Sequence, residues 1–418
     1  MKFQKYTKYK ASGVEWLGEI PEEWEVKRLK DIFLMNRGKF THRPRNDPKM
    51  YGGNFPFLQT GSVSISKKYI TEYKQTLSKL GTTVSKQFPK ETILMTIAAN
   101  IGDVAVLSFD AYFPDSIIGF KSSKKNDNNF SYYFLKILKK PLNQVKITNT
   151  QDNINLERLD IFERALPPKQ TQTKIANYLD EKTNLIDKKI SLLQKKKEKY
   201  KELKQTLINE VVTKGLDKTV KMKDSEIEWV GEIPEHWEVK RLKDFILYTI
   251  GGEVIDVSYW GNGNELLFTA GKNPVKSNFE NFPQRKRTKI NDILIARNGD
   301  GFIHMPPINS VFTNVVQLVR LSKIVNKNFI WYFLENIKFI INQTSNGDFI
   351  ASLNKDMWFN SFLVIPPKQE QIQIANYLDE KTGKIDEIIE KVDENIKVLK
   401  EFRKTLINDA VTGKIKVA

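Results

Sequence analysis

The chain has 418 residues, of which 40% are hydrophobic, and its 67 Lys and Arg residues exceed its 50 Asp and Glu residues by 17. This length is enough for two domains with separate cores, and the excess positive charge favours a polyanionic partner, nucleic acid before a membrane surface. The sequence contains no cysteine, which excludes disulfides, thiolate nucleophiles and cysteine-ligated zinc.

The sequence also lacks the patterns typical of a metal-binding, membrane-spanning or exported protein. The three histidines, His42, His236 and His304, show no metal-ligand spacing, so we expect no bound metal. Even the most apolar stretch, residues 329–341, carries charged residues and falls short of the ~20 apolar residues that span a bilayer. No apolar signal-peptide core follows the basic N-terminus, and we therefore expect a cytoplasmic protein.

The first recognisable element is a motif at residues 14–33, VEWLGEIPEEWEVKRLKDIF, which returns at residues 227–246 as IEWVGEIPEHWEVKRLKDFI. Most positions are identical at an offset of 213 residues, which indicates a tandem duplication. The tryptophans of this motif, Trp16, Trp24, Trp229 and Trp237, occur in both copies. We interpret them as shared packing or partner contacts, because residues that read different bases would differ between the copies.

The first variable body, residues 33–166, mixes β-type runs at 93–96 and 104–107 with a helical segment at 132–139. Polar loops in this body are candidates for reading DNA bases, because amide and hydroxyl side chains can hydrogen-bond base edges. Ordinary turn chemistry is the alternative explanation for each of them. The DNA-binding candidates are Gln59, Thr60, Asn100, Thr150, Gln151 and Asn153.

A proline pair and a long helix follow the first body. From Ile175, apolar residues recur at steps of three, four or seven through Leu179, Ile186, Leu203 and Val211, which predicts a coiled-coil seam ending before a glycine at 215. A helix of about 40 residues is on the order of 60 Å long, too long to bury its apolar stripe in one small domain. We expect Asp180 at the helix start to form surface ion pairs rather than act in catalysis. For the basic run at 195–204 a solvated face is favoured over DNA contact.

The second copy repeats this order with a different body. Residues 246–365 contain β-type runs at 293–295 and 315–319 and a helical segment at 331–341, followed by a second proline pair and helix with Phe402 in its seam. Its junction, 366–386, matches 167–187 at an offset of 199 residues. Loops at matched positions carry different polar residues, and these are the DNA-binding candidates Thr269, Arg297, Asn298, Asn346, Ser352 and Asn354.

Basic clusters in both bodies are candidates for phosphate contacts, although a charged cluster is more often merely solvated. They comprise Arg43, Arg45, Lys67, Lys68, Arg285, Lys286 and Arg287.

The duplication predicts the fold class and its domains. We expect an α+β protein with two globular target-recognition domains joined by two long antiparallel coiled-coil helices with pseudo-twofold symmetry. The predicted segments are 1–166, 167–215, 216–365 and 366–418. Two near-identical frames suit two copies of one partner, and two different bodies suit two different targets. A rigid spacer between them would set the distance between two half-sites along a duplex.

The segments GVEWLGEIPEEWEVKRLKD, PPKQTQTKIANYLDEKT and KELKQTLINEVVTKG closely resemble the specificity subunits of type I restriction-modification enzymes, over essentially the whole chain. The resemblance implies a non-catalytic subunit that recognises a bipartite target in double-stranded DNA. It implies docking of two methyltransferase subunits and of restriction subunits. It also implies that this chain holds no cofactor, while its partners use S-adenosylmethionine, ATP and magnesium.

The sequence agrees with a non-catalytic role, because it contains no methyltransferase motif, phosphate-binding loop or G-x-G-x-x-G run. Two alternatives remain open. The chain could be a fragment of a single-chain restriction enzyme, or a coiled-coil adaptor whose basic bodies bind proteins.

Overall fold

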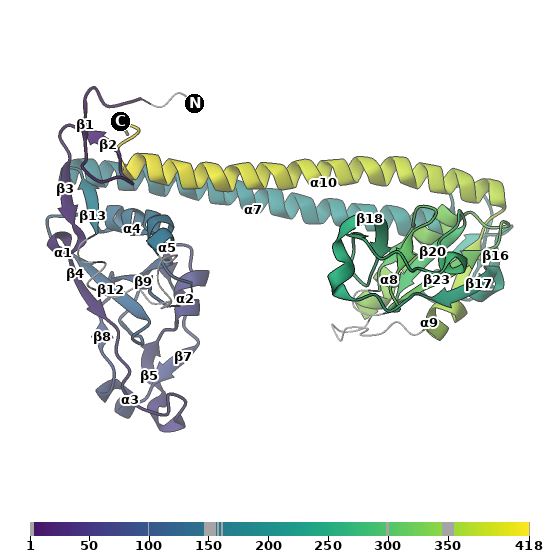
Figure 1. The fold of residues 1–418 in the computed structure, drawn as a ribbon, viewed down its shortest axis with the longest axis horizontal. Coiled ribbons are helices and arrows are strands. Elements are labelled where there is room, and N and C mark those ends of the chain that lie inside the picture. The colour runs from purple at the N-terminus through teal and green to yellow at the C-terminus, as the bar shows by residue number, and fades with distance from the viewer. Residues whose placement is uncertain are drawn as a thin grey trace. The chain divides into compact units, whose positions relative to one another are not determined.

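The computed structural model describes residues 4–98, 100–145, 156, 159, 162–297, 301–344 and 355–417. The chain divides into two compact units, Met1–Leu192 with Asn395–Ala418 and Leu193–Glu394. Each unit contains one variable body and a stretch of both long helices (Figure 1). The predicted α+β architecture with duplicated bodies and two long helices is confirmed, while the finer segmentation into four ranges stays a prediction.

The body of the first unit contains two main sheets. The five-stranded sheet has the order β4 (Phe33–Arg37), β12 (Ile117–Ser122), β9 (Ile93–Thr96), β10 (Val104–Leu107) and β6 (Tyr69–Ile70). The four-stranded sheet has the order β7 (Gln75–Leu77), β5 (Tyr51–Phe57), β11 (Ala111–Tyr112) and β8 (Gln87–Phe88), in which β5 and β11 run parallel. The predicted strands 93–96 and 104–107 coincide with β9 and β10, whose residues are all buried because β9 is central and β10 is covered by α4.

Short helices and two-stranded pairs complete this body. The helices are α1 (Leu29–Ile32), α2 (Thr60–Ile65), α3 (Lys79–Thr83), α4 (Asn128–Ile137) and α5 (Lys139–Val145), with a 3-10 turn η1 at Pro48–Met50. The pairs are β1 (Tyr9–Ala11) with β2 (Glu19–Pro21) and β3 (Glu25–Arg28) with β13 (Glu163–Leu166). Helix α4 begins four residues before the predicted 132, because the Asp127 carboxylate accepts a hydrogen bond from the Phe130 amide and caps the helix.

The second unit repeats the plan with smaller sheets. One sheet has the order β17 (Ile246–Gly251), β23 (Val316–Leu321), β20 (Asp292–Ala296) and β21 (Ile303–His304). The other has the order β19 (Val275–Ser277), β18 (Trp260–Phe268) and β22 (Val311–Phe312), and β18 and β22 again run parallel. The remaining elements are β14 (Met222–Asp224) with β15 (Glu232–Pro234), β16 (Glu238–Arg241) with β24 (Phe362–Ile365), α8 (Lys327–Thr344), α9 (Lys355–Asn360) and the turns η3 (Leu242–Phe245), η4 (Val257–Tyr259) and η5 (Gln284–Lys286).

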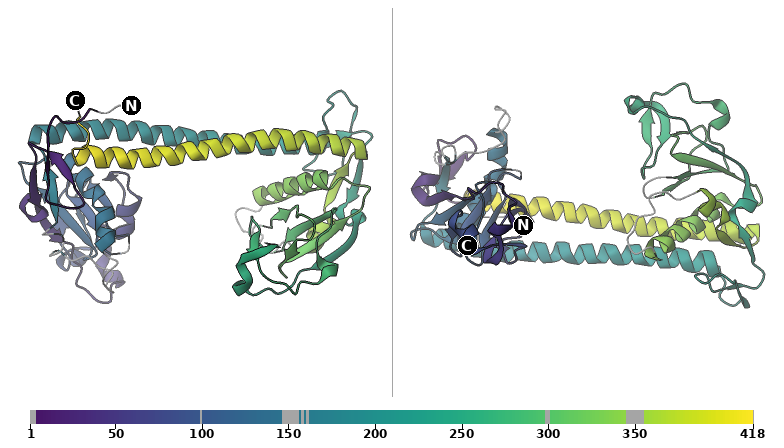
Figure 2. Two further views of the ribbon diagram at one scale, coloured as in Figure 1. Left: turned by 45° about the horizontal axis from the view of Figure 1, so that its top comes forward. Right: turned by 90° about the horizontal axis from the view of Figure 1, so that it is seen from below.

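The long helices are α7 (Lys169–Lys214) and α10 (Lys368–Val411), and they lie side by side within each unit (Figure 2). In the second unit Lys197 on α7 pairs with Asp393 on α10, and Lys204 pairs with Asp386. Residue numbers therefore rise along α7 as they fall along α10, so the two helices run antiparallel. The first unit has the equivalent pair, Asp187 with Arg403. The predicted antiparallel pairing is therefore present in both units.

Two predicted seam residues do not lie in the seam. Leu203 is 53% exposed and Phe402 is 37% exposed, and they occupy equivalent positions in the two copies. Val211, which was also predicted to lie in the seam, is buried, as is Ile208. Both belong to the hydrophobic core of the second body, so near this end of α7 the buried face packs against that body.

Each long helix ends at a glycine in the left-handed region that packs against a motif tryptophan. Gly215 has φ +76° and faces the ring of Trp237, and Gly413 has φ +78° and faces Trp24 and Pro21. Both tryptophans are fully buried, which accounts for their presence in both copies of the motif. In the described residues no helix is both long enough and apolar enough to cross a membrane.

Candidate nucleic-acid interface

The parallel strand pairs bring polar side chains to one edge of each body. In the first body, Gln59 and Thr60 follow the end of β5, and in the second body Thr269 follows the end of β18. The carboxyl ends of neighbouring parallel strands share one edge of a sheet, so the loops after β11 and β22 lie at the same edges. We call these regions the polar edges; their residues are Arg45, Gln59, Thr60, Gln75 and Asn100 in the first body and Thr269, Arg297, His304, Thr313 and Asn314 in the second.

The first polar edge is organised around helix α2. Gln59 immediately precedes this helix, Thr60 is its first residue, and the Asn100 amide donates to the hydroxyl of Ser64 on the same helix at 3.2 Å. The Nε2 of Gln59 donates to the Oε1 of Gln75 on the neighbouring strand at 3.1 Å. The structure therefore brings together three residues that the sequence singled out separately.

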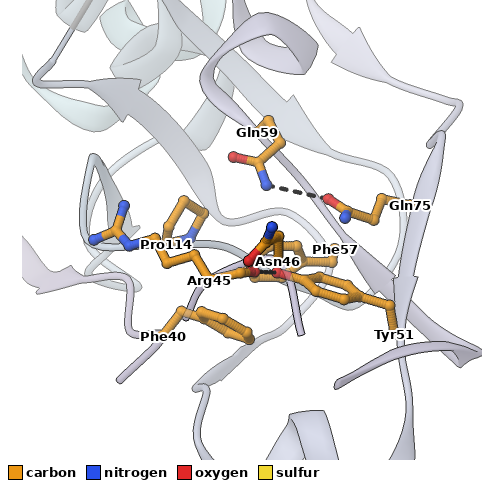
Figure 3. Close-up of a pocket in the computed structure, with 8 residues that line it drawn as sticks. All are labelled: Phe40, Arg45, Asn46, Tyr51, Phe57, Gln59, Gln75 and Pro114. Carbon is orange, nitrogen blue, oxygen red and sulfur yellow. Dashed lines mark hydrogen bonds between the residues drawn. The ribbon is translucent and has the colours of Figure 1, made fainter. Parts of the chain in front are cut away.

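A pocket of about 400 Å³ opens beside the glutamine pair (Figure 3). Its apolar wall includes Phe40 and Phe57, both buried, and Tyr51, whose ring stacks on that of Phe40 with centroids 5.8 Å apart. Arg45 also lines the pocket, and its guanidinium donates to the Asp115 carboxylate at 3.0 Å while the side chain stays half exposed. The pocket thus combines an aromatic wall with hydrogen-bonding groups at its mouth.

The second polar edge is more deeply buried. The hydroxyl of Thr269 accepts a hydrogen bond from the Gly271 amide at 3.1 Å and is 8% exposed, while the Arg297 guanidinium donates to the carbonyl of Asn314. The Thr313 amide donates to the carbonyl of Phe268, the residue before Thr269, at 3.0 Å. The strand order therefore places both predicted residues beside the loop after β22.

Sequence reasoning missed two members of this edge, His304 and Thr313. Burial lowers the pKa of His304, which favours the neutral imidazole. Its Nε2 and the Thr313 hydroxyl are buried without a hydrogen-bond partner among the described residues. The sequence gives no signal that His304 and Thr313 belong together, because each is brought to the edge by a different strand.

The phosphate-contact candidates divide by what they already bind. Lys68, Lys286 and Arg287 have side chains no more than 16% exposed, and each pairs with a carboxylate of its own unit: Asp180, Glu253 and Glu265 respectively. Their charges are therefore largely neutralised within the fold.

The other basic candidates are more accessible. Lys67 and Arg285 are exposed, and Arg43 is exposed but donates to the carbonyls of Phe40 and His42. Of the seven candidates for phosphate contact, Lys67 and Arg285 are therefore the most accessible. The base-reading candidates Thr150, Gln151, Asn153, Asn298, Asn346, Ser352 and Asn354 lie outside the described residues.

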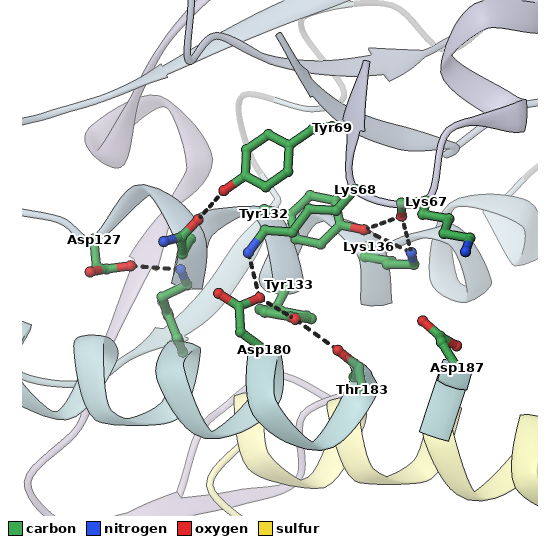
Figure 4. A network of polar contacts seen from close by, with 12 residues as sticks. Lys67, Lys68, Tyr69, Asp127, Tyr132, Tyr133, Lys136, Asp180, Thr183 and Asp187 are labelled. Atoms are coloured by element: carbon green, nitrogen blue, oxygen red, sulfur yellow. Dashed lines mark hydrogen bonds and ion pairs between the residues drawn. The ribbon is translucent and has the colours of Figure 1, made fainter. Parts of the chain in front are cut away.

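Each body is fixed to its helix by the same set of contacts, which we call the junction clamp; Figure 4 shows the clamp of the first unit. In the first unit Tyr133 donates to Asp180 at 2.6 Å and lies 3.1 Å from the Thr183 hydroxyl. In the second unit Tyr332 donates to Asp379 at 2.8 Å and lies 3.1 Å from the Thr382 hydroxyl. Burial raises the pKa of Tyr133 and of Tyr332, so both phenols stay protonated and can donate.

A glutamine completes each clamp. The Oε1 of Gln172 accepts from the Asp127 amide at 2.9 Å, and the Oε1 of Gln371 accepts from the Asn326 amide at 2.7 Å. Asp180 forms an ion pair, as predicted, but its partner is the partly buried Lys68 of the body and not a helical neighbour on the surface, and its carboxylate also accepts a hydrogen bond from Tyr133. The role of Asp180 follows from contacts across 47 and 112 positions of sequence, which helix periodicity does not reveal.

Within the described ranges no group of three or more acidic or histidine side chains is placed to hold a metal ion.

Comparison with known proteins gives consistent matches over both halves. The family model described as "Type I restriction modification DNA specificity domain" matches residues 21–202 and 234–398. The putative type I restriction enzyme MjaX specificity subunit of Methanocaldococcus jannaschii is 27% identical over 100% of this chain and 99% of its own length. The MjaIX specificity subunit of the same organism is 24% identical over 100% and 98%.

Solved structures match the fold. One chain comes from a study described as "Structural basis underlying complex assembly and conformational transition of the type I R-M system"; it aligns with a TM-score of 0.73 and 16% identity over 94% of this chain and 98% of its own. The HsdS subunit from Thermoanaerobacter tengcongensis aligns with a TM-score of 0.52 and 15% identity over 95% and 98%.

Proposed function

The chain belongs to the family of type I restriction-modification DNA specificity subunits, and from that premise we propose that it reads a bipartite DNA target with a fixed gap. As a specificity subunit it is a non-catalytic DNA-recognition component with two target-recognition domains. In the proposed assembly it docks two modification subunits and the restriction subunits, and those partners use S-adenosylmethionine, ATP and magnesium. We place this assembly in the cytoplasm.

The observation that carries the proposal is the pairing of a constant frame with unlike polar edges. The two edges occupy the same place relative to parallel strand pairs, yet one contains the amides Gln59 and Gln75, and the other contains Arg297 and the buried Thr269. Equivalent positions with different hydrogen-bonding groups suit two different short sequences. The excess of 17 positive charges supports association with the phosphate backbone.

The constant parts support the fixed gap and the paired partners. The junction clamps repeat the same Tyr, Asp and Thr contacts, so each body is attached to its helix in the same way. Helices α7 and α10 are unbroken over 46 and 44 residues, each on the order of 65 Å long. Duplicated frame surfaces favour two copies of one partner.

The proposal is tested by lengthening the spacer. One added heptad of ~7 residues at the same level of both helices preserves the seam and adds about 10 Å, or about three base pairs. In a complex with its modification subunits, the variant is expected to modify both original half-sites at a gap larger by about three base pairs. Altered half-sites, or an unchanged gap, would contradict the spacer role.

Salt dependence separates DNA recognition from an adaptor role. For the assembled complex, the affinity for target duplex is expected to fall steeply as salt rises, because neutralised phosphates release counterions. Absent or salt-insensitive DNA binding would instead favour an adaptor that binds proteins.

A further inference from the structure

The first polar edge contains a paired amide whose geometry points to one base. We propose that Gln59, held in place by Gln75, reads an adenine in the half-site recognised by the first body. This inference rests on the proposed function and assigns one base contact within it.

The position of Gln59 suits contact with a ligand outside the body. It follows β5 by two residues and is exposed at the start of α2. Gln75 is the first residue of β7, opposite Phe57 in the antiparallel β5–β7 pair, and is only partly exposed. The outer glutamine is therefore free to meet a base, and the inner one is anchored in the sheet.

The hydrogen bond between the two amides restricts Gln59 further. One proton of its Nε2 goes to Gln75 Oε1 at 3.1 Å, as the dashed line in Figure 3 shows. The Oε1 acceptor and the second Nε2 proton of Gln59 stay available side by side. Gln75 thus acts as a positioning residue that fixes the order of donor and acceptor.

A donor beside an acceptor matches adenine in the major groove. Adenine offers its N7 as acceptor and its N6 amino group as donor, and a glutamine amide satisfies both at once. Guanine offers two acceptors there, cytosine one donor, and thymine one acceptor and a methyl group, so each leaves part of a fixed amide unpaired. A donor or acceptor left unpaired at the contact disfavours the other three bases, which allows the amide to select adenine.

The surroundings of the pair favour a strong contact. Phe40 and Phe57 form a buried aromatic wall beside the amides, and hydrogen bonds are stronger where water is partly excluded. Arg45 lines the same pocket, where its guanidinium is paired with Asp115. In the second body Thr269 follows β18 and its hydroxyl is occupied by Gly271, so the adenine assignment applies to the first body alone.

The experiment maps methylated adenines in DNA modified by the whole chain assembled with its modification subunits. Gln59→Glu replaces the amide with an acceptor-only carboxylate that suits the cytosine amino group. We expect one adenine position of one half-site to lose preference by about tenfold or more and to shift towards cytosine, corresponding to at least ~1.4 kcal/mol. Gln59→Ala is expected to relax the same position to all four bases, and the other half-site is expected to stay unchanged.

Two further variants isolate the amide pair. Gln75→Glu keeps the acceptor for Gln59 and is expected to retain the adenine, whereas Gln75→Leu is expected to weaken it. The matched control is Gln87→Ala on β8 of the same sheet. Gln87 donates to Asp110, accepts from Tyr112 and is not part of the pair, so this variant should leave both half-sites intact.

The outcomes separate this inference from the proposed function. An undivided motif, or none, for the unaltered chain would overturn the proposed function and the inference with it. A bipartite motif that Gln59→Glu and Gln59→Ala leave unchanged, or change at a position that is not adenine, would overturn the adenine contact alone.

Discussion

An ion pair between Asp187 on α7 and Arg403 on α10 joins the two antiparallel helices of the first unit. The Arg403 Nε lies 3.0 Å from Oδ1, Nη2 donates to Oδ2 at 3.1 Å, and the two side chains are 30% and 19% exposed. Two unit charges about 4 Å apart attract by roughly 4 kcal/mol at an effective dielectric of about 20. Desolvation and side-chain ordering offset much of this, leaving a coupling of about 1–2 kcal/mol.

A double-mutant cycle measures that coupling. Asp187→Asn and Arg403→Gln remove the charges with little change in shape, and urea unfolding followed by circular dichroism gives the free energies. The reference cycle uses Glu198 and Lys201, an exposed pair within α7 for which about 0–0.5 kcal/mol is expected. A coupling for Asp187 and Arg403 no larger than this reference would refute the reasoning. Exchanging the two charges should recover most of the lost stability.

Three further perturbations test the interior and the junctions. Arg164 is fully buried with its guanidinium 3.5 Å from the ring centroid of Phe134 on α4, and the guanidinium has no hydrogen-bond partner among the described residues. Arg164→Leu should therefore raise the free energy of unfolding by about 1–3 kcal/mol, and a lower free energy of unfolding in urea would contradict this. Tyr332→Phe removes a hydrogen bond to Asp379 and should cost about 1 kcal/mol by the same measurement; a change below about 0.3 kcal/mol would argue against the clamp. Hydrogen bonding to Arg287 lowers the pKa of Glu265, so this pair stabilises the fold above the ordinary glutamate pKa and the contribution is lost as pH falls through the lowered value. Glu265→Gln should therefore flatten the acid limb of a stability-against-pH profile, and an unchanged limb would contradict the assignment.

The duplicated frame, the long helices and several strands could be predicted from the sequence because they depend on local pattern. The β-type run at 93–96 is β9 itself, because a short run dominated by apolar residues, here three of them before Thr96, is typical of a buried strand. The exposure of Leu203 could not be predicted from its helical spacing alone, because near this end of α7 the buried side chains, Ile208 and Val211, pack in the core of the second body.

The candidate site could be outlined but not assembled from the sequence. Gln59 and Asn100 follow strands and were identifiable as loop residues, whereas Gln75 gains its role only from strand pairing. Similarly, the sequence does not indicate that Lys68 and Lys286 form ion pairs, because their carboxylate partners are distant along the chain. Ion pairing across such separations depends on the tertiary fold, which composition and periodicity do not specify.

In the proposed function, two unlike target-recognition domains on one duplicated frame specify one bipartite DNA target. Mapping methylated adenines across the genome of a strain that carries this chain with its modification subunits tests the claim directly. The expected result is a single methylated motif of two different half-sites separated by a constant gap. Unmodified DNA, or one undivided motif, would contradict it.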